Sequence, residues 1–388
     1  MNKNMPRRQV LKTLAGVGVA VVAWPDALSQ IGTSPSKPPR HWPAWENFRQ
    51  HFISEGGRVI DRGSARNQTF SEGQGYALFF ALVADDRTAF EKVLRWTEDN
   101  LCGGDLTARL PAWLWGQRND DTWGVIDSNS ASDADLWIAY ALGEAGRLWN
   151  ERRYRALSSL ISARILREET AHLPGLGPSL LPGAHGFVVT PTRWRLNPSY
   201  MPMQLMRWFA AHEPQPIWQQ LAESALKIIT GAAPRGLAPD WTLYDAQQGF
   251  LTDLQGDEKG QGGYNAIRVY LWTGMLHPDA PERPVLLTTL SPMAHYVRDN
   301  GQPPESIDIQ TGHSDRPGPS GFSAALLPFL EAVGDKSTLQ LQLDRIEARP
   351  LRPEAYYEQA LGLFGGGWRE GRYRFAVNGR LQPRWGSP

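Results

Sequence analysis

The sequence has almost no cysteine and no net charge, and both shortages exclude functions. Its 388 residues include a single cysteine, Cys102, so no disulfide can form within the chain. Forty Lys and Arg residues balance forty Asp and Glu residues, whereas a protein that binds a polyanion needs a net or strongly patched basic surface. We therefore expect no structural disulfide and no nucleic acid partner.

Several catalytic motifs are also missing. The chain has no G-x-x-x-x-G-K-[ST] phosphate loop, no H-E-x-x-H zinc motif and no G-x-S-x-G nucleophile elbow. The segment Gly175-Leu176-Gly177 lacks the third glycine of a dinucleotide fingerprint. The eight histidines are scattered without the spacing of metal ligands. We expect no cofactor and no metal ion, which leaves carboxylates for acid–base chemistry.

Residues 1–29 have the three-part layout of an export signal. A basic segment with Arg7-Arg8 precedes a short apolar run and Ala27-Leu28-Ser29, which is similar to a cleavage site. The paired arginines resemble the twin-arginine motif; a Sec signal that happens to carry two arginines and an uncleaved anchor are the alternatives. The apolar run is too short to span a membrane comfortably. We expect a periplasmic or secreted protein without a membrane span after cleavage.

Beyond a Pro-rich lead-in at 30–43, the pattern indicates a single helical domain over 44–388. Apolar periodicity of helix length recurs about twelve times between Gly and Pro breakers. Short connections at Asp85-Asp86, Asn150 and Gly334 indicate helical hairpins. We expect helices at 44–53, 72–84, 86–101, 132–149, 151–169, 199–212, 215–231, 263–276, 284–299, 320–333, 335–347 and 354–365.

Two connecting segments are predicted to form β-hairpins. Residues 241–251 alternate around the turn at 246–249, and residues 373–377 precede Asn378-Gly379, a strong hairpin turn. We expect both hairpins to lie at one rim of the helical domain.

A glutamate stands at the start of a predicted apolar helix. Glu72 lies in Ser71-Glu72-Gly73-Gln74-Gly75-Tyr76, where flanking glycines would let a bulky substrate approach. Partial burial would raise its pKa and keep the proton that a general acid needs. The alternative is structural: Ser71 caps the helix and Glu72 favours the positive helix end.

A second acidic stretch spans 127–137. Ser130 and Asp133 match a capping-box variant, which is again the structural alternative. Asp133 and Asp135 are two residues apart on a helix and cannot face the same way. We therefore expect at most one of these two aspartates to point at a bound ligand.

Tryptophan is unusually frequent, with 16 residues. Such a surplus fits a heavily aromatic core or a surface on which flat ligands stack. Several aromatic residues fall in loops flanked by Gly or Pro, where a platform for sugar rings is at least as good an interpretation as core packing. They are Trp113, Trp115, Trp123, Trp194 and Tyr200.

At this point the motifs resemble a known family, glycoside hydrolase family 8. The similar segments are Trp42-Pro43-Ala44-Trp45, 71–76, 109–116, 127–149, Asn197-Pro198-Ser199-Tyr200, 266–270 and 321–325, in order along nearly the whole mature chain. The resemblance implies an (α/α)6 barrel, in agreement with the six hairpins counted from periodicity. It also implies endo-hydrolysis of β-1,4-glucan with inversion at the anomeric carbon.

The resemblance assigns roles to individual residues. Glu72 matches the proton donor of the family. Asp133 falls on the aspartate of the signature Ala-Ser-Asp-Ala-Asp; because an inverting enzyme forms no glycosyl-enzyme bond, we expect it to hold the distorted sugar. The residues implied to line the cleft are Trp113, Trp115, Tyr200, Tyr264 and Arg268.

The chain departs from the family pattern at one position. The pattern Tyr-Asp-Ala-Ile-Arg-Val-Tyr carries the general base as its aspartate, but this chain has Asn265 there. A neutral amide can orient a water molecule but cannot take its proton. Either another carboxylate serves or activity is weak. The candidates for the base are Asp253, Asp257, Glu258 and Asp133 itself.

These observations predict an endo-β-1,4-glucanase that trims glucan during bacterial cellulose synthesis and export. Its expected partners are the glucan chain and the cellulose export machinery. The neutral charge balance fits an uncharged polysaccharide, which needs no electrostatic steering. Two alternatives stay open: a catalytically impaired glucan-binding protein, because of Asn265, and a related chitosanase or xylanase.

Overall fold

The computed structural model describes residues 41–386 except 65 and 256–257. The predicted export signal and residues 30–40 of the predicted lead-in lie outside these residues. All elements below belong to one compact unit that begins at Trp42. The described residues form twelve α-helices, one in each of the twelve predicted segments.

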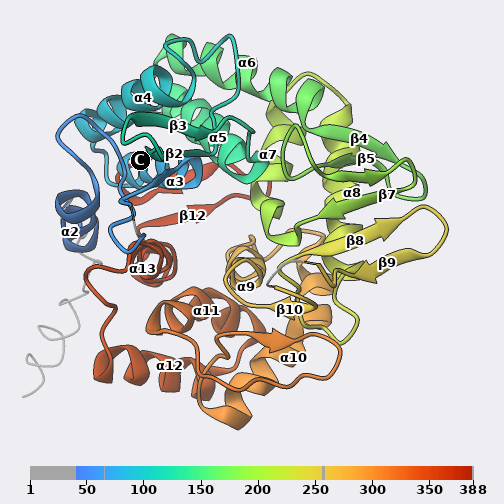
Figure 1. Ribbon diagram of the computed structural model, residues 1–388. Helices are drawn as coiled ribbons and strands as arrows, with labels where there is room; N and C mark the ends of the chain where they lie inside the picture. The colour runs from blue at the N-terminus through green and yellow to red at the C-terminus, as the bar shows by residue number, and fades with distance from the viewer. Residues whose placement is uncertain (1–40, 65, 256–257, 387–388) are drawn as a thin grey trace, which may run out of the picture. The chain divides into compact units, whose positions relative to one another are not determined.

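The helices form two concentric rings, an (α/α)6 barrel, in which α9 and α13 are seen end-on (Figure 1). The inner ring is α3 (Ser71–Val83), α5 (Ser132–Leu148), α7 (Met203–His212), α9 (Ala266–Gly274), α11 (Ser320–Val333) and α13 (Tyr356–Arg369). The outer ring is α2 (Pro43–Phe52), α4 (Arg87–Leu101), α6 (Arg152–Glu168), α8 (Ile217–Gly231), α10 (Arg283–Asn300) and α12 (Lys336–Ala348).

The apolar pattern of each helix sets its ring. In α9 all nine residues are buried, and in α3 every residue but Glu72 is buried; a helix that is apolar all round belongs in a core. By contrast, α4 buries only one stripe, which includes Phe90, Val93, Leu94 and Leu101. This spacing of three and four residues is typical of a helix with one solvent face.

Short and long connections alternate around the barrel. After α3, α5 and α11 the chain turns into the next outer helix within a few residues, through Asp85, Asn150 and Gly334. These three residues have φ values of 57°, 56° and 79°, in the left-handed region that Gly, Asn and Asp tolerate best. The connections from each outer helix to the next inner helix are longer than these three turns, and they lie at the end of the barrel opposite to the turns. Every inner helix therefore begins at the same end of the barrel.

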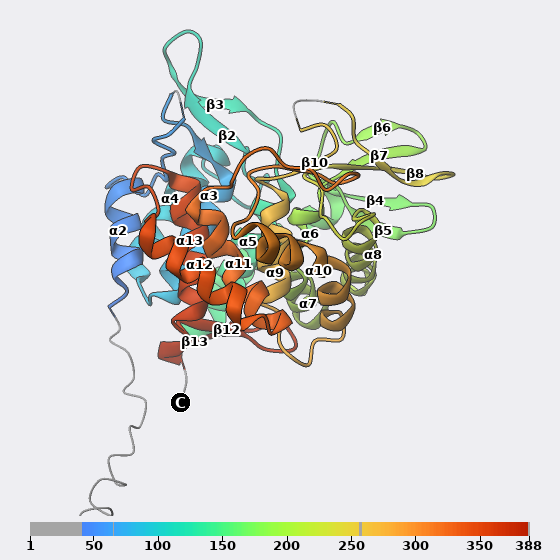
Figure 2. The same ribbon diagram turned by 90° about the horizontal axis from the view of Figure 1, so that it is seen from below.

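Small antiparallel sheets fill the long connections at this end (Figure 2). They are β1 (Thr69–Phe70), β2 (Leu114–Gln117) and β3 (Trp123–Asp127); β4 (Thr170–Leu173) and β5 (Gly177–Leu180); β6 (Val188–Thr190), β7 (Arg193–Leu196), β8 (Thr242–Asp245) and β9 (Gly249–Thr252); and β10 (Gln261–Gly262) with β11 (Ile307–Asp308). The short 3-10 helix η1 (Pro198–Tyr200) precedes α7. These connections contain more residues than are needed to join the packed helices.

Both predicted β-hairpins form, but not at one rim. Strands β8 and β9 pair as predicted, Thr242 opposite Thr252. The second hairpin, β12 (Tyr373–Phe375) with β13 (Leu381–Pro383), follows the end of α13 and therefore lies at the opposite end of the barrel (Figure 2). The prediction of a single rim was wrong, because periodicity does not show at which end a connection lies. A last 3-10 turn, η2 (Arg384–Gly386), follows β13.

Two helix boundaries differ from the prediction. Helix α13 was expected to stop at residue 365, yet it runs through Gly365-Gly366-Gly367 to Arg369. The glycines permit close contact: a Cβ at position 365 would lie 1.8 Å from the carbonyl oxygen of Ala324, on α11. Tertiary packing overrides the low helix propensity of glycine. The segment predicted from residue 199 begins with the separate turn η1, and α7 starts only at Met203.

No helix within the described part of the chain is both long and apolar enough to cross a membrane.

Candidate active site

A cavity of about 420 Å³ opens where the first turns of the inner helices converge. Its walls combine three carboxylates, aromatic rings and an amide. They come from the starts of α3, α5, α9 and α13, from η1 and from the neighbouring loops. The lining residues are Asp61, Phe70, Ser71, Glu72, Trp113, Ala131, Asp133, Tyr200, Tyr264, Asn265, Tyr356 and Tyr357. The structure thus brings together six of the eight predicted site residues at the cavity wall.

Arg268, in the first turn of α9, forms hydrogen bonds with several of these residues. Its Nη1 atom donates to Glu72 Oε2, to Tyr76 Oη at 2.9 Å and to Asp133 Oδ2 at 3.1 Å. Its Nη2 atom donates to Ser199 Oγ at 3.1 Å and to Asn265 Oδ1 at 2.7 Å. The guanidinium is buried, so these partners replace the water that it loses.

Glu72 is mostly buried but still reaches the cavity. Its side chain retains 21% exposure toward the cavity. The pKa of Glu72 is raised to about 7. Burial is the main cause, the positive charge of Arg268 opposes it, and the nearby Asp133 carboxylate adds to it. A carboxylic acid with a pKa near neutrality is what general acid catalysis requires.

Asp133 is more deeply placed. Its Oδ1 atom accepts from the backbone N–H of Ala134 at 2.8 Å, and its Oδ2 atom accepts from Arg268. Burial raises its pKa, while Arg268 acts in the opposite direction. Of the two aspartates, Asp133 lines the cavity and Asp135 does not.

The capping roles predicted as structural alternatives for Ser71 and Ser130 are wrong, whereas Glu72 does lie in the first turn of α3, at the positive helix end. The N-cap of α3 is Phe70, and Ser71 Oγ has no hydrogen-bond partner in the described part of the chain. The N-cap of α5 is Ala131, without a side-chain cap. Ser130 does not cap the helix but donates to Glu169 at 2.5 Å. Neither helix is capped by these serines, and both Glu72 and Asp133 line the cavity.

Asn265 stands at the start of α9 without capping that helix through its side chain. The cap comes from Asp240, whose Oδ1 atom accepts from the backbone N–H groups of Asn265 at 2.8 Å and Ala266 at 2.7 Å. The Asn265 amide oxygen is thereby fixed on Arg268, and its side chain borders the cavity. An amide in this position can orient a water molecule.

The aromatic predictions divide in two. Trp113, which stacks on Phe70 at 5.9 Å between ring centroids, lines the cavity, as do Tyr200 and Tyr264. Trp115 does not: it packs against Trp96 of α4, and the guanidinium of Arg58 lies 4.4 Å from its ring.

The remaining loop aromatics also stand apart from the cavity. Trp123 is 48% exposed beside Trp115, while Trp194 is buried.

The carboxylates predicted as possible bases mostly lie elsewhere. Asp253 is buried in an ion pair with Arg195 at 2.5 Å and does not line the cavity. Glu258 is exposed and outside the cavity. Asp257 lies outside the described residues. Of the three candidates that the structure describes, only Asp133 borders the site.

The polar wall residues that sequence reasoning missed include Asp61, Tyr356 and Tyr357. The two tyrosines begin α13, and the Tyr357 hydroxyl donates to the carbonyl oxygen of Tyr264 at 2.5 Å. A signal was present: every inner helix presents its first turn to the cavity end, so the start of the last predicted helix belonged to the site. Asp61 lies in a loop, where no periodicity marks it.

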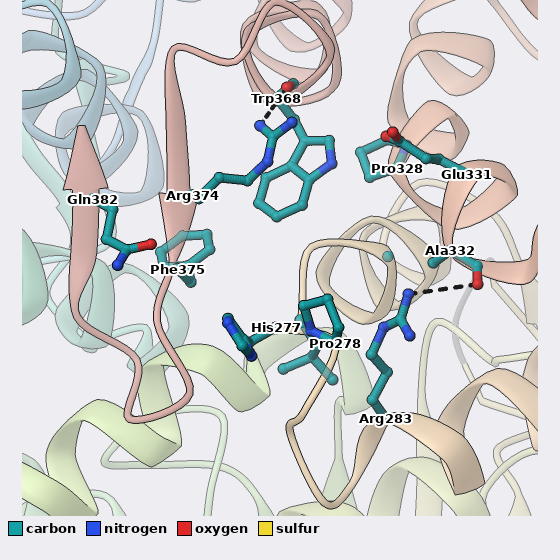
Figure 3. A pocket seen from close by; sticks show the side chains of 12 residues that line it. His277, Pro278, Arg283, Pro328, Glu331, Ala332, Trp368, Arg374, Phe375 and Gln382 are labelled. Atoms are coloured by element: carbon teal, nitrogen blue, oxygen red, sulfur yellow. Dashed lines mark hydrogen bonds between the residues drawn. The ribbon is translucent and has the colours of Figure 1, made fainter. Parts of the chain in front are cut away.

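A second cavity of about 320 Å³ lies at the other end of the barrel, where α9, α11 and α13 finish (Figure 3). Arg283 and Arg374 extend into it, and Arg374 stacks on Trp368 at 4.2 Å. Glu331 is the one carboxylate among its lining residues. A hydrolytic site for glycosides uses a carboxylate pair. This cavity has one carboxylate, so the first cavity is the better candidate for the active site.

The family is decided by comparison with known sequences. The model of "Glycosyl hydrolases family 8" matches residues 27–371, most of the chain. The chain belongs to glycosyl hydrolase family 8. It is thus a glycoside hydrolase, and the resemblance found in its motifs is confirmed.

Members of glycosyl hydrolase family 8 with similar sequences are named endoglucanases. One from Salmonella typhi is 48% identical over 89% of this chain and 91% of its own length. One from Xanthomonas axonopodis pv. citri is 45% identical over 99% of this chain and 98% of its own. The crystal structure of an endo-1,4-D-glucanase from Vibrio fischeri ES114 superposes with a TM-score of 0.82 at 44% identity, over 89% of this chain and all of that one.

Proposed function

We propose that this glycoside hydrolase is an endo-β-1,4-glucanase that cleaves cellulose-like chains with inversion. The observation that carries the proposal is Glu72, a carboxyl with a pKa near 7 on the wall of an aromatic-lined cavity, tied by one arginine to a second carboxylate. The endoglucanase names of relatives at 45–48% identity support the choice of substrate.

In the proposed reaction, protonated Glu72 gives its proton to the glycosidic oxygen as the bond to the anomeric carbon breaks. Arg268 holds the carboxyl in place and stabilises the carboxylate that the transfer leaves behind. Trp113 offers a ring face on which a glucose unit can stack.

Asp133 serves as a sugar-binding group. It and Glu72 contact the same Nη1 atom of Arg268, so their nearest oxygens lie closer together than the roughly 6.5–9.5 Å of an inverting acid–base pair. Both Asp133 oxygens already accept hydrogen bonds, which makes it a poor nucleophile. We expect it to bind hydroxyls of the distorted sugar, and NMR of the first product anomer tests inversion directly.

The attacking water is proposed to be oriented by Asn265 and deprotonated by Asp61. Asp61 is the third carboxylate on the cavity wall, after Glu72 and Asp133. Its Oδ1 atom accepts from the backbone N–H of Gly63, and the structure gives Oδ2 no protein partner within the described residues. A carboxylate at the wall supplies the proton acceptor that an amide cannot.

The Asp61 assignment predicts a coupling between two substitutions. Asp61→Asn is expected to lower kcat by about tenfold or more, because it removes the proton acceptor. In the Asn265→Asp background the same change is expected to cost much less, since the carboxylate at position 265 then takes the proton. The measurement is kcat on soluble glucan for the four chains of the cycle. Equal losses in both backgrounds would assign Asp61 a role other than the base.

The raised pKa of Glu72 predicts the alkaline side of the pH profile. Because burial raises this pKa to about 7, the protonated form prevails below pH 7 and is lost above it. We expect kcat/KM to fall by about tenfold per pH unit above that point. A kcat/KM that stays constant from pH 7 to 9 contradicts the role of Glu72 as proton donor.

Asn265 leaves a second function to be tested. With Asn265 at the family's base position, the chain could bind glucan and hydrolyse it only slowly or not at all. The aromatic wall would serve either function, so hydrolysis by variants at position 265, treated below, separates the two.

We further propose that the protein acts outside the cytoplasm, on glucan made during bacterial cellulose synthesis. The export-like sequence at 1–29 supports the location, and a single catalytic domain over 44–388 would follow the lead-in. Fractionation of cells that express the full chain, with Arg7 and Arg8 replaced by Lys as the control, tests the twin-arginine route. Cytoplasmic retention of the unaltered chain would contradict this location.

A further inference from the structure

Two carboxyl groups behind Asp133 have no part in the reaction described so far. Asp135, on α5, and Glu169, directly after α6, are both fully buried, with 0% exposure. They lie within hydrogen-bonding reach of each other. Neither forms an ion pair with a described residue, and the charges that raise the pKa of each are those of other carboxylates.

The hydrogen bonds around the pair do not balance if both groups are ionised. Glu169 Oε1 accepts from Ser130 Oγ at 2.5 Å. The other three oxygens, Glu169 Oε2 and both of Asp135, have no donor among the described residues. A carboxylate can only accept, whereas a carboxylic acid also donates. One proton on the pair therefore creates an O–H···O bond that satisfies two of the three oxygens.

Ser130 connects this pair to the cavity wall. Its Oγ atom donates to Glu169 and accepts from the backbone N–H of Ala184 at 3.1 Å. The backbone N–H of Ser132 donates to the carbonyl oxygen of Pro182 at 3.0 Å. The segment held in this way leads directly into Asp133.

We propose that Asp135 and Glu169 hold at least one proton between them and, through Ser130, act as positioning residues that keep Asp133 at Arg268 and the cavity. The positioning role rests on the proposed hydrolysis, whereas the shared proton does not. Two buried carboxylates in contact repel each other strongly, so loss of the proton would loosen this turn.

Other ionisable groups face the pair. Asp133 lies on the cavity side, bound to Arg268. Glu168 lies at the end of α6 in an ion pair with Arg164 at 2.8 Å. Cys102, after α4, is close enough for Asp135 to raise the pKa of its thiol. The two carboxylates disfavour ionisation of the pair, and Cys102 is neutral at physiological pH because burial also raises its pKa.

The sign of the effect on stability follows from linkage. Burial raises the pKa of Glu169 to about 8 and that of Asp135 well above its ordinary value, while in the unfolded chain both lie near 4. The folded protein therefore binds more protons between about pH 4 and pH 8. The stability that this proton contributes is complete below pH 4 and is lost as the pH rises through about 8.

Glu169→Gln tests the shared proton, because an amide can donate to Asp135 without titrating. Infrared spectra at pH 6 are expected to show the carbonyl band of a buried, protonated carboxyl in the wild type and in Glu72→Gln, and to lose it in Glu169→Gln. From pH 5 to pH 8 the unfolding constant of the wild type should rise more steeply than that of Glu169→Gln, by up to about tenfold per pH unit. Glu168→Gln, one residue away, is the control for loss of a neighbouring charge: it should keep the band at pH 6 and most of the slope, because the contact between Asp135 and Glu169 remains.

Activity tests the positioning role separately. Glu169→Ala is expected to lower kcat on soluble glucan by about 10- to 100-fold, and Glu169→Gln to recover most of that loss. An infrared band and a pH slope unchanged by Glu169→Gln would overturn the shared proton. A band that behaves as expected, with kcat equal in Glu169→Ala and wild type, would overturn positioning alone. If the wild type hydrolyses no glucan, the proposed function fails while the infrared result still decides the proton.

Discussion

Replacing Glu72 by glutamine is expected to lower kcat on β-1,4-glucan by about 10²–10⁴-fold, with little change in KM. The amide has nearly the shape of the carboxyl and can still accept from Arg268, so binding should persist. It has no acidic proton to give to the glycosidic oxygen, and this loss falls on the bond-breaking step. Initial rates of reducing-end formation on soluble glucan measure the effect.

Glu258→Gln is the matched control for this substitution. Glu258 is exposed and does not line the cavity, and only its charge reaches Tyr200 on the wall, so its replacement should lower kcat far less than Glu72→Gln does. The comparison also tests whether Glu258 supplies the base, as the sequence allowed. A Glu72→Gln protein that folds normally and keeps its kcat would mean that another group donates the proton.

Replacing Asn265 by aspartate is expected to raise kcat by about tenfold, less than the roughly 10²–10⁴-fold of a general base added where none exists, because Asp61 already accepts the proton. The new carboxylate would stand at the family's base position, where it can take the proton of the attacking water. It can also keep the hydrogen bond that the Asn265 Oδ1 atom accepts from Arg268 at 2.7 Å. Rates of both chains on the same glucan, with binding measured separately, give the change.

Asn265→Ala is the control for this gain. It removes the group that orients water and should lower kcat, while Asp61 remains as proton acceptor. Three outcomes separate the functions. A slow wild type that Asn265→Asp accelerates supports the proposed enzyme; an inert wild type rescued by aspartate supports the binding protein; an unchanged or lower rate in Asn265→Asp rules out the family's base geometry for this chain.

Much of the fold could be predicted because helical periodicity is a local property of the sequence. All twelve predicted helices form, and the tight turns at Asp85, Asn150 and Gly334 fall where they were expected. The end of α13 could not be predicted, because the glycines that continue the helix do so through contact with Ala324, far away in the sequence.

The site residues that could be predicted are those marked by the local sequence around them. Glu72, Asp133 and Arg268 stand in first turns of inner helices, and the structure joins all three. Trp115 could not be told from Trp113 without knowing which face of the sheet meets the cavity. Asp61 has no local pattern, and it reaches the wall only through the folding of its loop.

The partnership of Asp135 with Glu169 was hidden for a similar reason. Asp135 lies on α5 and Glu169 directly after α6, so the two meet only because these helices pack together. From the sequence, Ser130 was more simply interpreted as a helix cap, whereas in the structure its hydroxyl bonds to Glu169.

The most direct test of the account is the viscosity of carboxymethylcellulose followed over time with the wild type, Glu72→Gln and Asn265→Asp. Cleavage within the chain lowers viscosity long before many reducing ends appear. We predict a slow fall with the wild type, a faster fall with Asn265→Asp and none with Glu72→Gln. A viscosity that falls equally with Glu72→Gln and the wild type would contradict the account.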